Sequence, residues 1–214
     1  MRKHSSLGLI LVLALVMAFS GASLVRAGSV ENLDTSETFS SIQAAIDDSD
    51  TDAGDVIEVG PGTYDISTES FPIEVDKSVS LWGAQAGVDP RLSEGGRNGS
   101  ESIIDAEQNS GRVIRVSASD VEINGFTITG GTGDMVDEDG SADNLMFQYN
   151  ILYDDLSTSG DEGIQIKNSS GVTIQYNYAY DINQDAFNLS KNPSGSSGAV
   201  QYNEAKNVHS SNAA

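Results

Sequence analysis

Short segments in which apolar and polar residues alternate recur along the second half of the chain. Four of them, FQYNILYD, IQYNYAYD, VQYNEAKN and VEINGFTI, share the same apolar spacing. Alternation with a period of two is typical of strands with one buried face. When the segments are aligned, two columns are apolar throughout: Ile123, Phe147, Ile174 and Val200, and then Ile128, Leu152, Ala179 and Ala205. Each segment therefore predicts short strands rather than a helix.

The segments follow one another at intervals of 24, 27 and 26 residues. A repeat of this length indicates a solenoid, in which each coil stacks its inward side chains on the coil below. Further short strands are expected between the segments, at 113–116, 163–166 and 186–189, so that each coil contains more than one strand. The pattern predicts an all-β fold, a right-handed single-stranded parallel β-helix.

The Gln-Tyr-Asn triplets place identical residues one coil apart. Asn tolerates turn geometry and can hydrogen-bond its equivalent in the next coil, so a structural ladder is favoured over a binding role for Asn150, Asn177 and Asn203. The tyrosines are expected to stack in a parallel column. That column is either packing alone or, if exposed, a substrate-binding platform for sugars made of Tyr149, Tyr176 and Tyr202.

The first half of the chain predicts a cap and the first coils. Phe39, Ile42, Ala45 and Ile46 fit a helical stripe in FSSIQAAIDDS, and this helix is expected to close the N-terminal end. Strands are expected in GDVIEVGPGTYDI, FPIEV and VSLWG, and residues 89–102 are expected to leave the coil as a loop. We therefore assign 28–55 to an N-terminal cap and 56–214 to β-helix coils, with the C-terminal coils expected to be incomplete.

The chain begins like a secretory signal. Arg2 and Lys3 precede an apolar run over residues 7–19, and Val25-Arg26-Ala27 offers a cleavage pattern after residue 27. Ser20-Gly21-Ala22 is a second cleavage choice, and an uncleaved anchor is the alternative. Residues 1–27 are thus interpreted as a signal peptide, which predicts a secreted or cell-surface protein with no membrane span after cleavage.

Charge and composition exclude several kinds of function. Removal of the signal leaves 8 basic and 32 acidic residues, a formal charge of −24, which repels nucleic acid and anionic membranes. Such acidity is typical of proteins in concentrated salt, and it also supplies oxygen ligands for Ca²⁺. The chain has no Cys and its two histidines are His4 and His209. Disulfides, Cys/His metal sites and Ser-His-Asp catalysis therefore lack their residues.

Several segments together resemble a known superfamily. The run SIQAAIDDSDTDAGDVIEVGPGTYDI, then SVSLWGAQAGVDPR, VEINGFTITGG and the Gln-Tyr-Asn coils are similar to the pectin lyase-like right-handed β-helix proteins, over most of residues 39–207. The resemblance implies the fold. It does not imply one activity, because these proteins include lyases, esterases, hydrolases, epimerases and noncatalytic surface proteins.

Acidic residues are concentrated between the predicted coils, where alignment places Asp154 over Asp181 and Glu162 over Asp185. The polysaccharide lyases of the superfamily bind calcium with aspartates and use a Lys or Arg as base, and DINQDAFNLSK loosely resembles one such pattern. The resemblance implies Lys191 as base, with Lys167 as the comparable candidate, and metal ligands at Asp154, Asp155, Asp181 and Asp185. The alternative is a solvated acidic coat and a surface lysine.

Three functions follow from these observations. The first is a secreted β-helix that binds or processes extracellular polysaccharide, the second is a calcium-dependent polyuronate lyase, and the third is a noncatalytic structural solenoid of the cell surface. Asn-x-Ser/Thr sequences at Asn98, Asn168 and Asn188 permit glycosylation in a host able to perform it.

Overall fold

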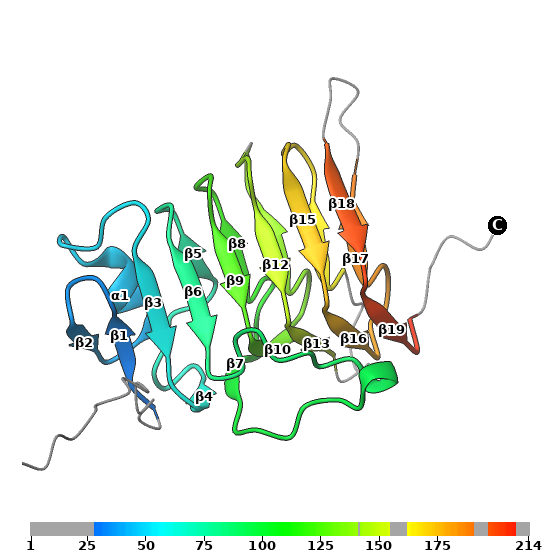
Figure 1. The fold of residues 1–214 in the computed structure, drawn as a ribbon, viewed down its shortest axis with the longest axis horizontal. Coiled ribbons are helices and arrows are strands. Elements are labelled where there is room, and N and C mark those ends of the chain that lie inside the picture. Colours follow the sequence, from blue (N-terminus) through cyan, green and yellow to red (C-terminus); the bar gives the residue numbers. More distant parts are fainter. Residues whose placement is uncertain (1–27, 141, 155–161, 191–196, 209–214) are drawn as a thin grey trace, which may run out of the picture.

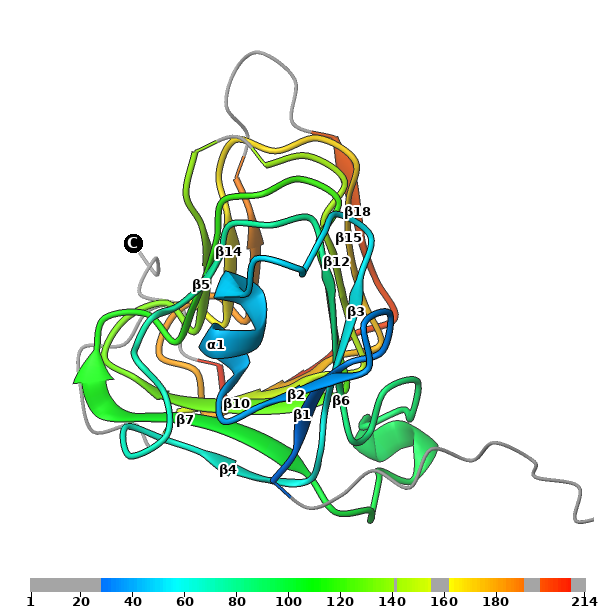
Figure 2. The same cartoon turned by 90° about the vertical axis from the view of Figure 1, so that its left-hand side faces the viewer.

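The structure, a computed structural model, describes residues 28–140, 142–154, 162–190 and 197–208. The chain winds into a right-handed parallel β-helix, with successive coils stacked along the long axis (Figure 1). Viewed from the N-terminal end, the three strand-bearing sides of the coils enclose one interior (Figure 2). The fold expected from the repeat is confirmed.

Three sheets form these sides, and each takes about one strand from each coil. Sheet A consists of β1 (Val30–Asn32), β2 (Glu37–Phe39), β3 (Val56–Val59), β6 (Ser80–Gly83), β9 (Glu122–Asn124), β12 (Met146–Gln148), β15 (Val172–Gln175) and β18 (Gly198–Gln201). Sheet B consists of β4 (Gly62–Tyr64), β7 (Ser102–Ser110), β10 (Phe126–Gly131), β13 (Ile151–Tyr153), β16 (Tyr178–Tyr180) and β19 (Glu204–Lys206). Sheet C consists of β5 (Ile73–Val75), β8 (Ile114–Val116), β11 (Val136–Glu138), β14 (Ile164–Ile166) and β17 (Phe187–Leu189).

The strand register follows the two apolar columns of the sequence. In sheet A, Phe147 pairs with Ile123 and Ile174, and in sheet B, Leu152 pairs with Ile128 and Ala179. All of these side chains are buried. Because parallel strands keep the same residues inward in every coil, the interior is one continuous apolar core.

The predicted asparagine ladder is present at the bend from sheet A to sheet B. The backbone N–H of Asn150 donates to Asn177 Oδ1 at 2.9 Å, and that of Asn177 donates to Asn203 Oδ1 at 2.9 Å. Each amide group also donates to a backbone carbonyl in the preceding strand of sheet A. The ladder therefore satisfies buried polar groups that the bend would otherwise leave without partners.

Helix α1 (Ile42–Asp47) lies across the N-terminal end of the core (Figure 2). Ser41 caps it by accepting from Ala44 N at 3.0 Å, and the Glu69 carboxylate accepts from Ile42 N at 2.6 Å. The expectation that Phe39 belongs to the helix was wrong, because Phe39 ends β2 and the chain is still extended at Ser41. Within the described residues, no helix has the length and apolar character needed to cross a bilayer.

Residues 84–101, between β6 and β7, leave the coil and are called the strap. They include a 3₁₀ turn, η1 (Leu92–Glu94), and run beneath the coils as far as β16 and β19 (Figure 1). The base of the strap is closed by a hydrogen bond from Ala84 N to Ser102 Oγ at 2.8 Å. A Cβ at Gly125, whose φ is 81°, would lie 2.2 Å from Ala86 N, so glycine is required for this close approach.

Candidate functional site

A groove separates the strap from the outer face of sheet B. It has a volume of about 400 Å³. The strap provides an apolar edge with Pro90 and Leu92, and three tyrosines of sheet B, Tyr153, Tyr178 and Tyr180, provide the floor. Leu92 is 53% exposed at this edge, which leaves an apolar contact surface open to a ligand.

Arg97 fixes the strap to the coils. Its side chain is fully buried and forms an ion pair with Glu101 at 2.6 Å. It also donates to the backbone carbonyl oxygens of Phe126 at 3.0 Å and of Tyr149 at 2.5 Å. Burial lowers the pKa of Arg97, and the ion pair with Glu101 opposes that effect. The Arg97 guanidinium thus connects the root of the strap to β10 and to the bend before β13.

Two further contacts hold the far end of the strap. Ser93 N donates to the Glu204 carboxylate at 2.9 Å, across 111 residues of sequence. The Arg91 guanidinium lies 5.2 Å from the centre of the Tyr176 ring and is paired with Asp89 at 2.6 Å. The strap is therefore held at both ends by contacts within the chain.

The tyrosine floor combines flat apolar rings with hydroxyl groups. The rings of Tyr153 and Tyr180 are stacked with centres 5.0 Å apart, and those of Tyr178 and Tyr180 lie 5.3 Å apart. Burial raises the pKa of Tyr180 to about 12, and the neighbouring tyrosines Tyr153 and Tyr178 add to the shift. The Tyr180 hydroxyl therefore stays neutral and can both donate and accept a hydrogen bond at ordinary pH.

The predicted tyrosine column of the Gln-Tyr-Asn triplets is also present, outside this groove. Tyr149, Tyr176 and Tyr202 stack with ring centres 5.2 Å apart. Most ring faces in the column are covered by the next ring, whereas Tyr202 is 58% exposed at its end. The stacking is confirmed, and a sugar-binding role for the column stays a prediction.

A second, polar cavity of about 550 Å³ lies on the outer face of sheet C, and Lys167 lines it together with Arg112, Asp134 and Glu162. Lys167 Nζ lies 3.7 Å from Oδ1 of the buried Asp137, which also accepts a hydrogen bond from Arg112. Lys167 is thus the predicted base candidate that the structure places in a cavity.

Asp134 and Glu162 form a hydrogen-bonded carboxyl pair in that cavity. Burial raises the pKa of Asp134 to about 7, and its hydrogen bond with Glu162 contributes to the shift. Burial alone would raise the pKa of Glu162, but hydrogen bonds from Asp134 and Asn188 outweigh it and lower that pKa. The pair therefore holds one proton near neutral pH, and a proton donor and acceptor stand beside Lys167.

Three of the predicted metal ligands, Asp154, Asp181 and Asp185, are among the described residues and lie on the segments between sheets B and C. Asn188 Nδ2 bridges Glu162 Oε1 at 3.1 Å and Asp185 Oδ2 at 3.3 Å, so these two carboxylates do lie one coil apart. Asp154 accepts from Asn183 at 3.4 Å, and Asp181 accepts from Asn207 at 2.9 Å. Asp155 and Lys191 lie outside the described residues.

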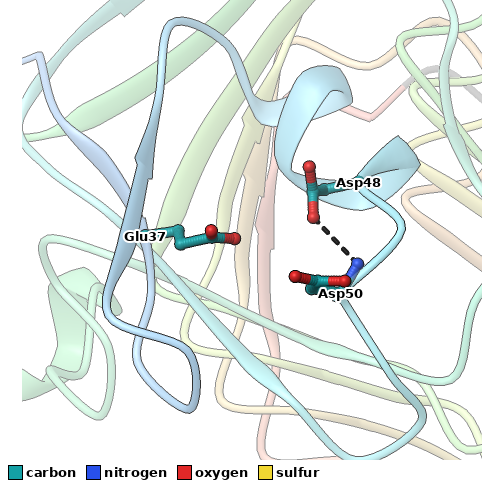
Figure 3. A group of neighbouring side chains, drawn as sticks. All are labelled: Glu37, Asp48 and Asp50. Atoms are coloured by element: carbon teal, nitrogen blue, oxygen red, sulfur yellow. Dashed lines mark hydrogen bonds between the residues drawn. The ribbon is translucent and has the colours of Figure 1, made fainter.

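Within the described part of the chain, carboxylate oxygens of three residues come within 4.8 Å of one another at Glu37, Asp48 and Asp50. These residues come from β2 and from the chain just after α1 (Figure 3). Asp48 already accepts a hydrogen bond from Asp50 N at 2.9 Å, and Glu37 and Asp50 are exposed. The group lies at the N-terminal cap, far in sequence from the predicted ligands, and calcium binding stays a prediction.

The family match covers the cap and most of the coils. A model described as "Protein of unknown function (DUF1565)" matches residues 28–198. The chain belongs to the DUF1565 family. The match covers sheet C, the strap, both cavities and the strands of sheets A and B up to the start of β18. Membership of the pectin lyase-like superfamily by name stays a prediction.

One curated relative adds to the DUF1565 assignment. Over 131 residues the chain is 37% identical to a protein named "Cell surface glycoprotein" from Methanothermus fervidus. The match covers 61% of this chain and 18% of that protein, so the chain spans less than a fifth of the relative. No solved structure matches the chain.

The repeated triplets do not predict the groove tyrosines, because Tyr153, Tyr178 and Tyr180 lie outside the Gln-Tyr-Asn sequences. Tyr153, Tyr178 and Tyr180 occupy outward positions of two alternating segments, and that pattern alone predicts exposed side chains. The sequence does contain one indication of them, which is the number of aromatic residues at outward positions. Three such residues on adjacent strands form a large apolar patch, which is typical of a binding surface.

Proposed function

We propose that this DUF1565 chain is a secreted or cell-surface β-helix module that binds extracellular polysaccharide in the groove beneath the strap. The observation that carries the proposal is the tyrosine floor facing the apolar edge of the strap. The similarity to a cell surface glycoprotein supports the location. The C–H faces of sugar rings pack on aromatic and aliphatic surfaces, while tyrosine hydroxyls and backbone groups hydrogen-bond sugar hydroxyls.

The charge of the chain favours a neutral polysaccharide as the ligand. The 32 acidic residues give the surface a negative potential that repels polyanions. Arg97, the basic residue that lines the groove, is buried and already paired with Glu101. Recognition by ring stacking and hydrogen bonds does not depend on a charged group of the ligand.

Replacement of Tyr180 by Ala is expected to weaken polysaccharide binding about tenfold. A tenfold loss corresponds to about 1.4 kcal/mol, which is less than the value of burying one large apolar side chain. Affinity electrophoresis in gels that contain neutral polysaccharides measures the change. Leu92→Ala, at an exposed position of the strap, is expected to weaken binding in the same assay without affecting the fold.

Tyr202→Ala is the matched control, because Tyr202 is exposed but belongs to the triplet column. Polysaccharide in the gel should slow the migration of this variant as much as that of the unaltered protein. Loss of binding in Tyr202→Ala with no change in Tyr180→Ala and Leu92→Ala would assign binding to the column instead. If no polysaccharide slows the migration of the folded protein, the proposed binding is wrong, and a noncatalytic structural role at the cell surface is the remaining function.

A second candidate, a calcium-dependent polyuronate lyase, is favoured by the position of Lys167 in the cavity on sheet C. There Lys167 would take the proton from the carbon beside the uronate carboxyl group, the C–O bond to the leaving sugar would break, and a double bond would form. Arg112, whose side chain is 44% exposed, would face the uronate carboxylate. Lys191 remains the other predicted base.

Lys167→Ala is expected to lower the elimination rate at least about 100-fold, the usual contribution of a positioned base. The ultraviolet absorbance of unsaturated products from pectate and alginate, with calcium and with a chelator, measures this rate. Lys191→Ala, assayed in parallel, shows which lysine acts. Absence of an absorbance rise from the folded, unaltered protein would exclude the lyase function for this chain.

A further inference from the structure

A third cavity opens on sheet A, beside the start of the strap. It has a volume of about 410 Å³. Glu58, Trp82 and Asn124 line it, together with small residues from the start of the strap. Glu58 and Trp82 are register partners on adjacent strands β3 and β6, and both are partly exposed. Trp82 is the single tryptophan of the chain.

Two carboxylates, those of Glu58 and Glu122, lie next to this tryptophan, and a third, that of Glu31, lies beside Glu58. Glu122 accepts a hydrogen bond from Trp82 Nε1 at 3.3 Å. Glu31 lies directly opposite Glu58 in the antiparallel pair of β1 and β3. Like charges in that position destabilise a sheet. Burial raises the pKa of Glu58, and the charge of Glu31 raises it further. The negative charge of Glu58, the register partner of Trp82, is therefore unfavourable for the fold.

The residues that line this cavity include no Lys or Arg that would neutralise the carboxylates. A bound cation would remove the repulsion between Glu31 and Glu58. The volume is far larger than a metal ion needs, and the indole ring offers a flat face rather than an oxygen ligand. Ammonium groups that carry carbon substituents bind aromatic faces by cation–π attraction and gain from neighbouring carboxylates.

We propose that Trp82, Glu58 and Glu122 form a binding site for an organic ammonium group. The indole ring packs against the carbon substituents and Glu58, which lines the cavity, balances the positive charge, while Glu122 adds negative charge from its position at Trp82 Nε1. Asn124, whose side chain is 6% exposed, is held by Glu122 at 2.9 Å and by Gly87 N at 3.0 Å, so it fixes the start of the strap at the edge of the site. The site is separate from the groove and does not depend on the proposed polysaccharide binding.

The single tryptophan makes a direct test possible, because all tryptophan fluorescence of the protein comes from Trp82. The folded protein is titrated with tetramethylammonium chloride and with glucosamine hydrochloride. Glucose is the neutral control for glucosamine, and sodium chloride at equal ionic strength is the control for charge screening. Both ammonium compounds are expected to give saturable changes in fluorescence, and glucose and sodium chloride are expected to give none.

Glu58→Gln is expected to weaken ammonium binding at least fivefold while it raises thermal stability, because it removes the repulsion with Glu31. Asp76→Asn is the matched control, since it removes one exposed negative charge next to sheet C and should bind like the unaltered protein. A response to glucosamine alone would restrict the ligand to amino sugars. Equal responses to glucosamine and glucose, a response reproduced by sodium chloride, or unchanged binding in Glu58→Gln would overturn the proposal.

Discussion

Replacement of Asn177 by Ala is expected to destabilise the β-helix by about 4 kcal/mol. The side chain is fully buried, donates to Phe147 O at 2.9 Å and accepts from Asn150 N at 2.9 Å. Alanine leaves both backbone groups buried without partners, and each such group costs about 1–3 kcal/mol. Urea denaturation followed by circular dichroism measures the change in the free energy of unfolding.

Asn203→Ala tests whether this cost comes from the interior of the ladder. Asn203 is only partly buried, in the last described coil, so water can replace part of its hydrogen bonding. Its replacement should cost about 1 kcal/mol, the usual net value of one hydrogen bond. Equal losses at both positions, or a loss below about 1 kcal/mol at Asn177, would contradict the structural role of the ladder.

Replacement of Arg97 by Ala is expected to cost about 3–4 kcal/mol and to release the strap. The change leaves Glu101 without the partner of a largely buried ion pair, which typically costs about 3–5 kcal/mol. It also removes a donor from the carbonyl groups of Phe126 and Tyr149. Limited proteolysis followed by mass spectrometry should show much faster cleavage within residues 84–101, together with a lower midpoint of unfolding.

Arg91→Ala is the matched control on the same segment. Arg91 pairs with Asp89 two residues away and lies over Tyr176 near the surface, where such contacts are worth about 1 kcal/mol or less. Its cleavage rate should stay close to that of the unaltered protein. Cleavage of Arg97→Ala at the rate of the unaltered protein would mean that Arg97 does not hold the strap.

The coils could be predicted from the sequence because their signal is local and repeated. Alternation around Phe147 and Ile174 fixes which side chains face inward, and the Gln-Tyr-Asn triplets fix the register one coil at a time. The asparagine ladder and the tyrosine column follow from that register. Phe39 was misplaced because an apolar residue beside a short helix fits its stripe equally well from the preceding strand.

The groove could not be predicted, because it depends on the path of a segment without periodicity. Residues 84–101 reach the later coils through contacts such as Ser93 with Glu204, which are 111 residues apart. No local pattern encodes such a contact. Tyr153 and Tyr180 gain a binding role only when the strap faces them, and the cavity of Lys167 likewise depends on residues from four coils.

Hydrogen exchange tests the groove most directly, because it reports protection at each backbone amide. Exchange is measured with and without a neutral polysaccharide that slows the protein in affinity electrophoresis. Binding in the groove predicts added protection in the strap around residues 90–98 and in β13 and β16, with no change around Tyr202. Protection confined to the turn at Tyr202 or to the outer face of sheet C would contradict it.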